Sequence, residues 1–212
     1  MTQAVLDKPQ RLKAAIVRRA AELGFDVCRI VRPDGAAASG DRLDGWLAEG
    51  RHGTMDWMAD TAERRRDPRV LWPEVRSIVM LGMNYGPADD PLATLTQKQR
   101  ATISVYARNR DYHDVMKGKL KTLAQWLQSG TAARLAGLGN ENKPAVKVFV
   151  DTAPVIEKPL AAAAGIGWQG KHTNLVSREF GSWLFLGSVF TTLELAPDEP
   201  ATDACGSCRD CL

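Results

Sequence analysis

The chain has 212 residues, 44% of them hydrophobic, and its 28 Lys and Arg side chains nearly balance 25 Asp and Glu. That length suffices for a domain with a sizeable buried core. A net charge of +3 is too small to indicate a general nucleic-acid binder, although a local basic patch is compatible with it. There is no apolar run of membrane-spanning length and no signal-peptide core at the N-terminus, so we expect a cytoplasmic protein that does not enter a membrane.

Hydrophobic periodicity predicts the first elements. Residues 10–23 place apolar side chains every three to four positions, which is typical of an amphipathic helix. Residues 25–31 then predict a strand, and the small residues of 33–40 predict a flexible loop. Asp41 is expected to cap a short helix after that loop.

A run of three arginines ends the next predicted helix, which Thr54 is expected to cap. Arg64, Arg65 and Arg66 fit either a solvated helix end, stabilised by the helix dipole, or a grip on an anion, and charge alone does not decide between them. Residues 77–85 are continuously apolar, as in a central strand buried on both faces. The polar residues 86–99 predict a surface excursion.

The longest predicted helix covers residues 111–128, after an extended segment at 102–106. A potential polar cluster lies at the start of this helix, beside the strand ends, and consists of Asp111, Tyr112 and His113. A single histidine is most often a satisfied structural residue, so we interpret His113 as structural. Residues 129–143 are rich in glycine and are expected to form a surface loop.

The stretch 150–177 organises the rest of the chain. A β-branched and aromatic run stops at Asp151, which is how a strand delivers a carboxylate to the rim of a sheet. An Ala-rich helix follows and is expected to end at Gly165. The glycines at 165, 167 and 170 match a dinucleotide-binding fingerprint, but the expected helix lies before them and the β-rich run after them, the reverse of that motif. We therefore disfavour a nucleotide site, while close chain reversal and another ligand role stay open.

Residues 183–190 predict a further buried strand, and 193–203 an acidic linker. Three of the four cysteines follow with C-x2-C-x2-C spacing, at Cys205, Cys208 and Cys211. This spacing opens the bacterial ferredoxin run, whereas a zinc site would need another Cys or His nearby. We expect these thiolates to ligate a 4Fe–4S cluster, with an incomplete ligand set in this chain. Cys28 is expected to be buried and inert.

Strands and helices alternate without an internal repeat, which predicts an α/β (α+β) fold with a layered sheet flanked by helices. We expect one domain over residues 1–195 and the truncated start of a ferredoxin-like 4Fe–4S domain over 196–212.

Together these motifs resemble the epoxyqueuosine reductase family of cobalamin- and iron–sulfur-dependent enzymes. The matching stretches cover most of the chain and are ERRRDPRVLWP (63–73), SIVMLGMNY (77–85), RDYHDV (110–115), VDTAPVIEKPLAAAAGIGWQGKHTNLVS (150–177), EFGSWLFLGSVFTT (179–192) and CGSCRDCL (205–212). The resemblance implies reduction of epoxyqueuosine to queuosine at the wobble position of tRNA, with electrons passing from 4Fe–4S clusters to cobalamin. It also implies that residues 1–195 form the cobalamin-binding catalytic domain.

The resemblance assigns roles residue by residue. Asp151 occupies the proton-donor position, and the implied cobalamin contacts are Arg65, Ser104, Asp151, Leu175 and Leu186. Lys158, Lys171 and His172 border the same cleft and are candidates for binding the tRNA backbone or the corrin side chains. The implied partners are the tRNA anticodon loop and an external electron donor, and we expect a monomer. The family's remaining cysteines and its C-terminal helical-repeat part are absent, so turnover by this chain alone is not expected.

Two other interpretations stay open. One is a flavin- or iron–sulfur-dependent electron-transfer module that does not act on tRNA, which a yellow flavin absorbance band would reveal. The other is a non-catalytic module that binds tRNA or metal, and loss of epoxide reduction on replacing Asp151 by Asn would exclude it.

Overall fold

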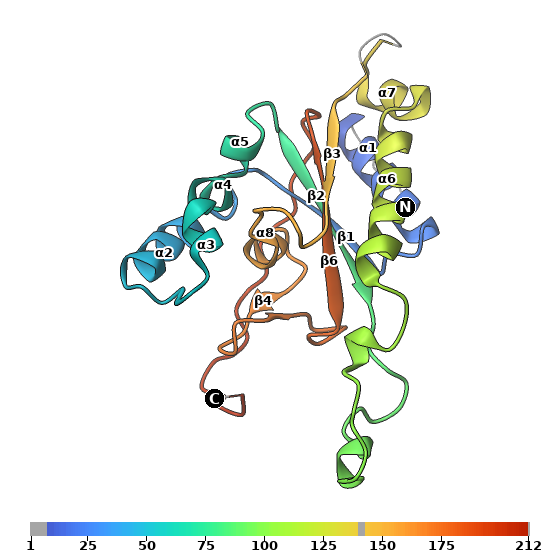
Figure 1. Cartoon of the computed structure of the whole chain (residues 1–212). Helices are drawn as coiled ribbons and strands as arrows, with labels where there is room; N and C mark the ends of the chain where they lie inside the picture. Colours follow the sequence, from blue (N-terminus) through green and yellow to red (C-terminus); the bar gives the residue numbers. More distant parts are fainter. Residues whose placement is uncertain (1–7, 140–142, 212) are drawn as a thin grey trace.

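The protein is built around one antiparallel sheet. The computed structural model describes residues 8–139 and 143–211, so the N-terminal segment on which the absence of a signal peptide was judged lies partly outside the described residues. The sheet order is β1 (Val27–Val31), β2 (Ser77–Asn84), β6 (Leu184–Thr191), β3 (Val146–Phe149). Helices cover both faces (Figure 1), which confirms the predicted layered fold. Because the strand pairs are all antiparallel, the architecture is α+β.

One face of the sheet packs against three helices, α1 (Lys8–Glu22), α6 (Tyr112–Leu127) and α7 (Gly130–Ala136) (Figure 1). The predicted amphipathic stripes of the two longer helices are confirmed. In α1 the buried residues are Leu12, Ala15, Ile16 and Ala20, and in α6 they are Met116, Leu120, Leu123, Ala124 and Leu127. Asp111 caps α6, because its side chain accepts the His113 backbone N–H.

The opposite face packs against α8 (Glu157–Ala163), with a peripheral group of helices farther out (Figure 1). These are α2 (Ala37–Ala48), α3 (Asp56–Asp60), α4 (Ala62–Arg66) and α5 (Pro68–Leu71). A small hairpin of β4 (Trp168–Gln169) and β5 (Leu175–Val176) follows α8. Residues 86–110 project beyond the sheet as an arm that holds two 3₁₀ turns, η1 (Ala93–Thr96) and η2 (Val105–Ala107) (Figure 1).

Two loops predicted from composition are wrong. The structure starts α2 within 33–40, at Ala37, so Asp41 lies inside that helix instead of capping it. Most of the described part of 129–143 is α7, which begins at the Ser129 cap and ends at the left-handed Gly137. In both segments small residues pack against neighbouring parts of the fold. Composition alone does not reveal this packing, and a run of small residues therefore predicts a loop.

Two boundary predictions are also wrong. Thr54 caps nothing, because α3 begins after Met55 and a second short helix, α4, carries the three arginines. Of the segment 102–106, which was expected to be extended, Val105 and Tyr106 belong to η2. The central strand β2 is confirmed, since residues 77–82 are all buried. Cys28 is buried as expected, and desolvation raises the pKa of its thiol to about 12.

The glycine turn after α8 serves close packing of the backbone. Gly165 has a φ of 83°, and a Cβ atom there would lie 2.3 Å from the Glu199 carbonyl oxygen. A Cβ atom on Gly167 would lie 2.2 Å from the Val176 carbonyl oxygen. The turn lies between a helix and a β-hairpin, so the geometry is not that of a dinucleotide-binding loop.

The predicted linker 193–203 packs along the edge of the sheet. Leu193 and Leu195 are buried, and Asp198 exchanges two hydrogen bonds with Ile30 of β1. Among the helices of the described residues, none combines the length and apolar character needed to cross a bilayer.

Candidate active site

Asp151 lies where β3 has ended, at the edge of the sheet. Its backbone adopts a left-handed conformation, with a φ of 53°. The Tyr112 hydroxyl donates a hydrogen bond to Asp151 Oδ2 over 2.6 Å, and His113 Nε2 lies 3.4 Å from the same oxygen. The Asp151 side chain is 60% exposed. The carboxyl group is therefore held by two neighbours and still open to a ligand.

A second carboxylate supports His113 from the opposite side of its ring. His113 Nδ1 lies 2.7 Å from Asp111 Oδ1, and this hydrogen bond is the main cause that raises the pKa of His113. Hydrogen bonds from His113 lower the pKa of Asp111 in turn. The exposed Asp111 and Asp151 and the half-buried His113 between them form a continuous polar chain. The predicted polar cluster at the start of α6 is confirmed, and the structure places His113 of that cluster beside Asp151.

Four aromatic rings form a stacked column beside Asp151. Successive ring centroids are 4.1 Å apart for Tyr85 and Phe185, 4.1 Å for Phe185 and Tyr112, and 4.0 Å for Tyr112 and His113. Burial is the first cause that raises the pKa of Tyr112, and the hydrogen bond to Asp151 is the second. Tyr112 is therefore a neutral hydrogen-bond donor at physiological pH.

Glu157, the first residue of α8, binds Asp151 from the other layer. Its Oε1 atom accepts the Asp151 backbone N–H over 2.9 Å. The side chain is half-buried, and desolvation raises the pKa of its carboxyl group to about 7. The sequence analysis did not single out Glu157. The one signal that could have indicated it is its position as an acid in the first turn of the helix that follows Asp151.

The predicted cobalamin contacts are only partly brought together. Leu175 and Leu186 belong to one apolar cluster on the α8 face of the sheet. Arg65 lies at the end of α4, donates to Thr61 and stacks 5.0 Å above the Trp57 ring. Burial is the main cause that lowers the pKa of Arg65, and the negative charge of Glu157 opposes this shift. Arg65 is therefore close enough to Glu157 to feel its charge.

Ser104 lies apart from these residues, on the projecting arm. It precedes η2 and its side chain is exposed. Among the described contacts, none joins Ser104 to Asp151.

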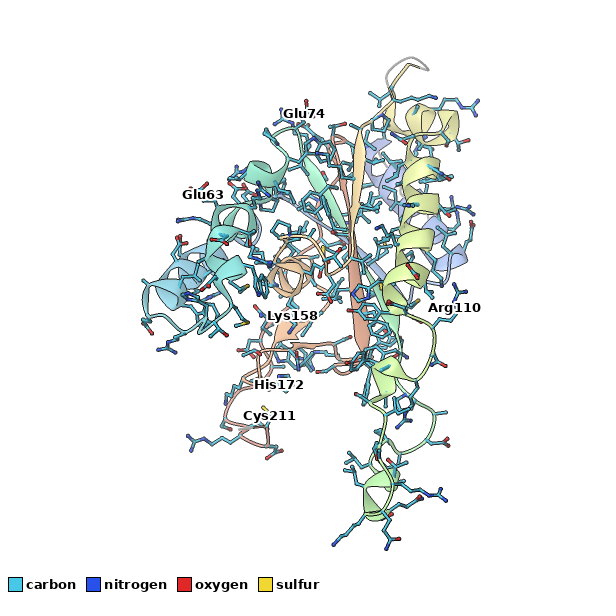
Figure 2. The ribbon with its side chains drawn as sticks, in the orientation of Figure 1. Glu63, Glu74, Arg110, Lys158, His172 and Cys211 are labelled. Carbon is cyan, nitrogen blue, oxygen red and sulfur yellow. The ribbon has the colours of Figure 1, made fainter. Side chains whose placement is uncertain are left out.

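Two of the predicted substrate-binding side chains, Lys158 and His172, lie on the α8 side of the sheet, between that helix and the C-terminal tail (Figure 2). Lys158 Nζ donates to Asn174 Oδ1 over 2.9 Å, and His172 Nδ1 accepts the Asn174 backbone N–H over 3.2 Å. Lys171 instead contacts the C-terminal tail, donating to the carbonyl oxygens of Gly206 and Cys208 over 2.9 and 2.6 Å. Lys158 and His172 are thus linked through one asparagine, whereas Lys171 is engaged by the tail.

The cysteine tail is docked but does not form a metal site in this structure. The Trp168 indole N–H donates to Cys205 Sγ over 3.3 Å. Over residues 8–139 and 143–211, no three His, Cys, Asp or Glu side chains gather closely enough to hold a metal ion. The three thiols therefore do not fit a cluster as they stand, and their role as ligands stays a prediction.

Comparison with known proteins identifies the family. The profile described as "Epoxyqueuosine reductase QueG, DUF1730" matches residues 65–152. The epoxyqueuosine reductase of Xanthomonas campestris pv. campestris is 42% identical over 215 aligned residues, which cover 99% of this chain. The chain belongs to the epoxyqueuosine reductase family. It spans 57% of the length of the Xanthomonas protein.

Solved epoxyqueuosine reductases share this fold. One, in complex with a tRNA-Tyr stem loop modified with epoxyqueuosine, has a TM-score of 0.75 and 26% identity, covering 94% of this chain and 50% of that one. The Bacillus subtilis enzyme, in a state with its catalytic Asp loop swung out of the active site, has a TM-score of 0.75 and 25% identity, covering 96% of this chain and 51% of that one.

A more distant likeness extends to another class of reductase. A reductive dehalogenase, described with a mechanism for B12-dependent dehalogenation, has a TM-score of 0.51 at 16% identity, covering 96% of this chain and 22% of that one. At that identity the likeness concerns the fold alone.

Proposed function

We propose that the whole protein is a cytoplasmic oxidoreductase that reduces epoxyqueuosine to queuosine at the wobble position of tRNA. The observation that carries this proposal is the exposed Asp151 carboxyl group, bonded by Tyr112 and His113 at the sheet edge of an epoxyqueuosine reductase family member. A family member solved with an epoxyqueuosine-modified stem loop supports tRNA as the substrate.

The reaction needs an acid at this position. Converting the epoxide to an alkene takes up two electrons and two protons and releases the oxygen as water, so the leaving oxygen must be protonated. Asp151 Oδ2 accepts the Tyr112 hydroxyl and lies beside His113 Nε2, so Oδ2 is the oxygen that His113 would reprotonate. Tyr112 would fix the direction in which the carboxyl group points.

His113 and Asp111 would resupply that proton. Asp111 lies at the surface and stabilises the protonated imidazole of His113, whose Nε2 atom faces Asp151 Oδ2 at 3.4 Å. A proton on Nε2 can therefore move to Asp151 after each transfer. Both protons of the reaction can enter by this route.

Cobalamin, when bound, would supply the reducing cobalt centre. The apolar cluster with Leu175 and Leu186 and the exposed carboxyl of Asp151 suit a flat macrocycle with an apolar face, and Arg65 would meet its polar side chains. The fold likeness to a B12-dependent dehalogenase supports this choice. Ser104 would reach the cofactor from the arm. In this proposal residues 1–195 form the cobalamin-binding domain.

An external electron donor would feed a 4Fe–4S cluster held in part by Cys205, Cys208 and Cys211. Residues 196–212 would begin that second, ferredoxin-like domain.

The anticodon loop would enter beside Lys158 and His172, with the protein acting as a monomer. Unpaired loop bases can be splayed into a pocket at low cost, so a small basic rim is sufficient. Lys171 would act indirectly, by holding the tail through its two carbonyl contacts.

Replacing Asp151 by Asn in the complete enzyme tests the proposal. Queuosine and its epoxide would be quantified in tRNA by mass spectrometry. Asp151→Asn is expected to lower the reduction rate by about 100-fold or more, the usual contribution of a general acid, while the corrin absorbance of bound cobalamin is retained. The matched control is Asp114→Asn, an exposed acid in the first turn of α6. An undiminished rate would reject Asp151 as the acid, and a flavin spectrum would reject cobalamin.

A further inference from the structure

Asp151 is contacted from both layers of the fold, and the two contacts differ in kind. From α6, Tyr112 binds the carboxyl group. From α8, Glu157 binds the backbone N–H. The mechanism above uses the first contact only. Glu157 is a half-buried acid, six residues along the chain from Asp151, without an assigned role.

The backbone of Asp151 needs such support. A non-glycine residue at a φ of 53° is uncommon and costs about 1 kcal/mol or more unless its surroundings hold it. The residue also follows the last ladder pair of β3, so its N–H has no partner strand. The bond to Glu157 satisfies that donor and fixes the loop that carries the carboxyl group.

We propose that Glu157 is a positioning residue of the active site, which fixes the Asp151 carboxyl group against Tyr112 and His113 by accepting the Asp151 backbone N–H. This inference rests on the proposed function for its catalytic consequence, but its structural part does not. One family member has been seen with its catalytic Asp loop swung out of the active site. In this chain the bond from Glu157 would favour the inward position of the corresponding loop.

Glu157 can accept the Asp151 backbone N–H whether its carboxyl group is protonated or ionised. The groups that face it are Asp151, His113 and Arg65. Burial is the main cause that raises the pKa of Glu157 to about 7, and the Asp151 charge adds to it, whereas the Asp151 backbone N–H and the charges of His113 and Arg65 oppose it. Both protonation states are therefore populated at neutral pH. Each state offers an oxygen that can accept the Asp151 N–H, and so does the amide of glutamine.

Three replacements in the complete enzyme separate the acceptor from the charge. Glu157→Gln keeps an acceptor oxygen, Glu157→Met keeps the volume without one, and Glu157→Ala removes both. The matched control is Glu63→Ala, because Glu63 is an exposed glutamate in the first turn of α4 (Figure 2). Melting temperature verifies that each variant is folded.

Hydrogen exchange, resolved to single residues by mass spectrometry, gives the direct readout. Exchange of the Asp151 amide is expected to speed up by at least about tenfold in the Met and Ala variants and to change little in the Gln and Glu63 variants. The kcat for epoxide reduction should fall by about tenfold in the Met and Ala variants with KM for tRNA within about twofold, and Gln should recover most of it.

Two outcomes would overturn the inference. One is an Asp151 amide whose exchange is unchanged in both the Met and Ala variants. The other is faster exchange together with a wild-type kcat, which would make the bond structural only. If the wild-type enzyme itself does not reduce epoxyqueuosine, the proposed function fails, whereas the exchange result still decides whether Glu157 holds Asp151.

Discussion

Replacing Glu157 by Gln should remove a loss of folding stability that wild type shows as the pH rises. Desolvation raises the pKa of Glu157 from 4.5 to about 7, so the folded chain binds this proton more tightly than the unfolded chain does. The associated stability is fully present below pH 4.5. It is lost as the pH rises through about 7, because the unfolded chain has by then released its proton while the folded chain must ionise a half-buried carboxyl group.

The size of the effect follows from the pKa values. Moving from 4.5 to about 7, at about 1.4 kcal/mol for each pH unit, corresponds to about 3 kcal/mol. Because the side chain is only half-buried, we expect about 2 kcal/mol of it to be measurable. For a chain of this length that is a shift of about 4–8 °C in Tm.

Thermal denaturation followed by circular dichroism between pH 5 and pH 8.5 would measure it. Wild type should lose stability relative to Glu157→Gln as the pH rises, by about 2 kcal/mol in total. His113, whose pKa is raised by Asp111, is present in both proteins, so the difference isolates Glu157. Glu63→Gln, at an exposed site, should stay parallel to wild type. Parallel curves for Glu157→Gln and wild type would refute the reasoning.

Two further predictions concern neighbouring features. Asp111→Asn should lower the pKa of His113, because the Asp111 hydrogen bond is the main cause of its elevation, and an NMR titration of the imidazole that shows no change would contradict this. Gly167→Ala should destabilise the fold by about 2 kcal/mol or more, since the added Cβ would lie 2.2 Å from the Val176 carbonyl oxygen. Gly45→Ala, with open space around it in α2, should be neutral or stabilising. Equal Tm values for the two variants would exclude the steric explanation.

Sequence periodicity was sufficient where burial is strong and regular. The apolar stripes of α1 and α6 and the continuous apolar run of β2 each bury the residues that the pattern indicates. It was insufficient for α2 and α7. In α7 the buried residues are Ala132 and Ala133, whose small side chains carry little hydrophobic signal. There, capping by Ser129 and packing against α1 and α6 decide the structure.

The candidate site was predictable only in part, for a related reason. Asp151 stood out because a strand stopped at an acid, and the cluster at the start of α6 stood out because three polar groups adjoin. Glu157 had no such mark. Its importance comes from burial and from a hydrogen bond to a backbone group, and neither quantity is encoded in local sequence.

The strand register explains why these residues meet at all. Asn84 pairs with Leu184, and Phe149 pairs with Ser188. This register brings the C-terminal ends of β2 and β3 and the start of β6 to the same end of the sheet. Along β6, Phe185 then faces α6 and stacks on Tyr112, while Leu186 faces α8. A slip of one residue would exchange these faces and dismantle the aromatic column. The acid therefore stands between the polar, aromatic layer on the α6 side and the apolar layer on the α8 side, and Glu157 joins the second layer to it.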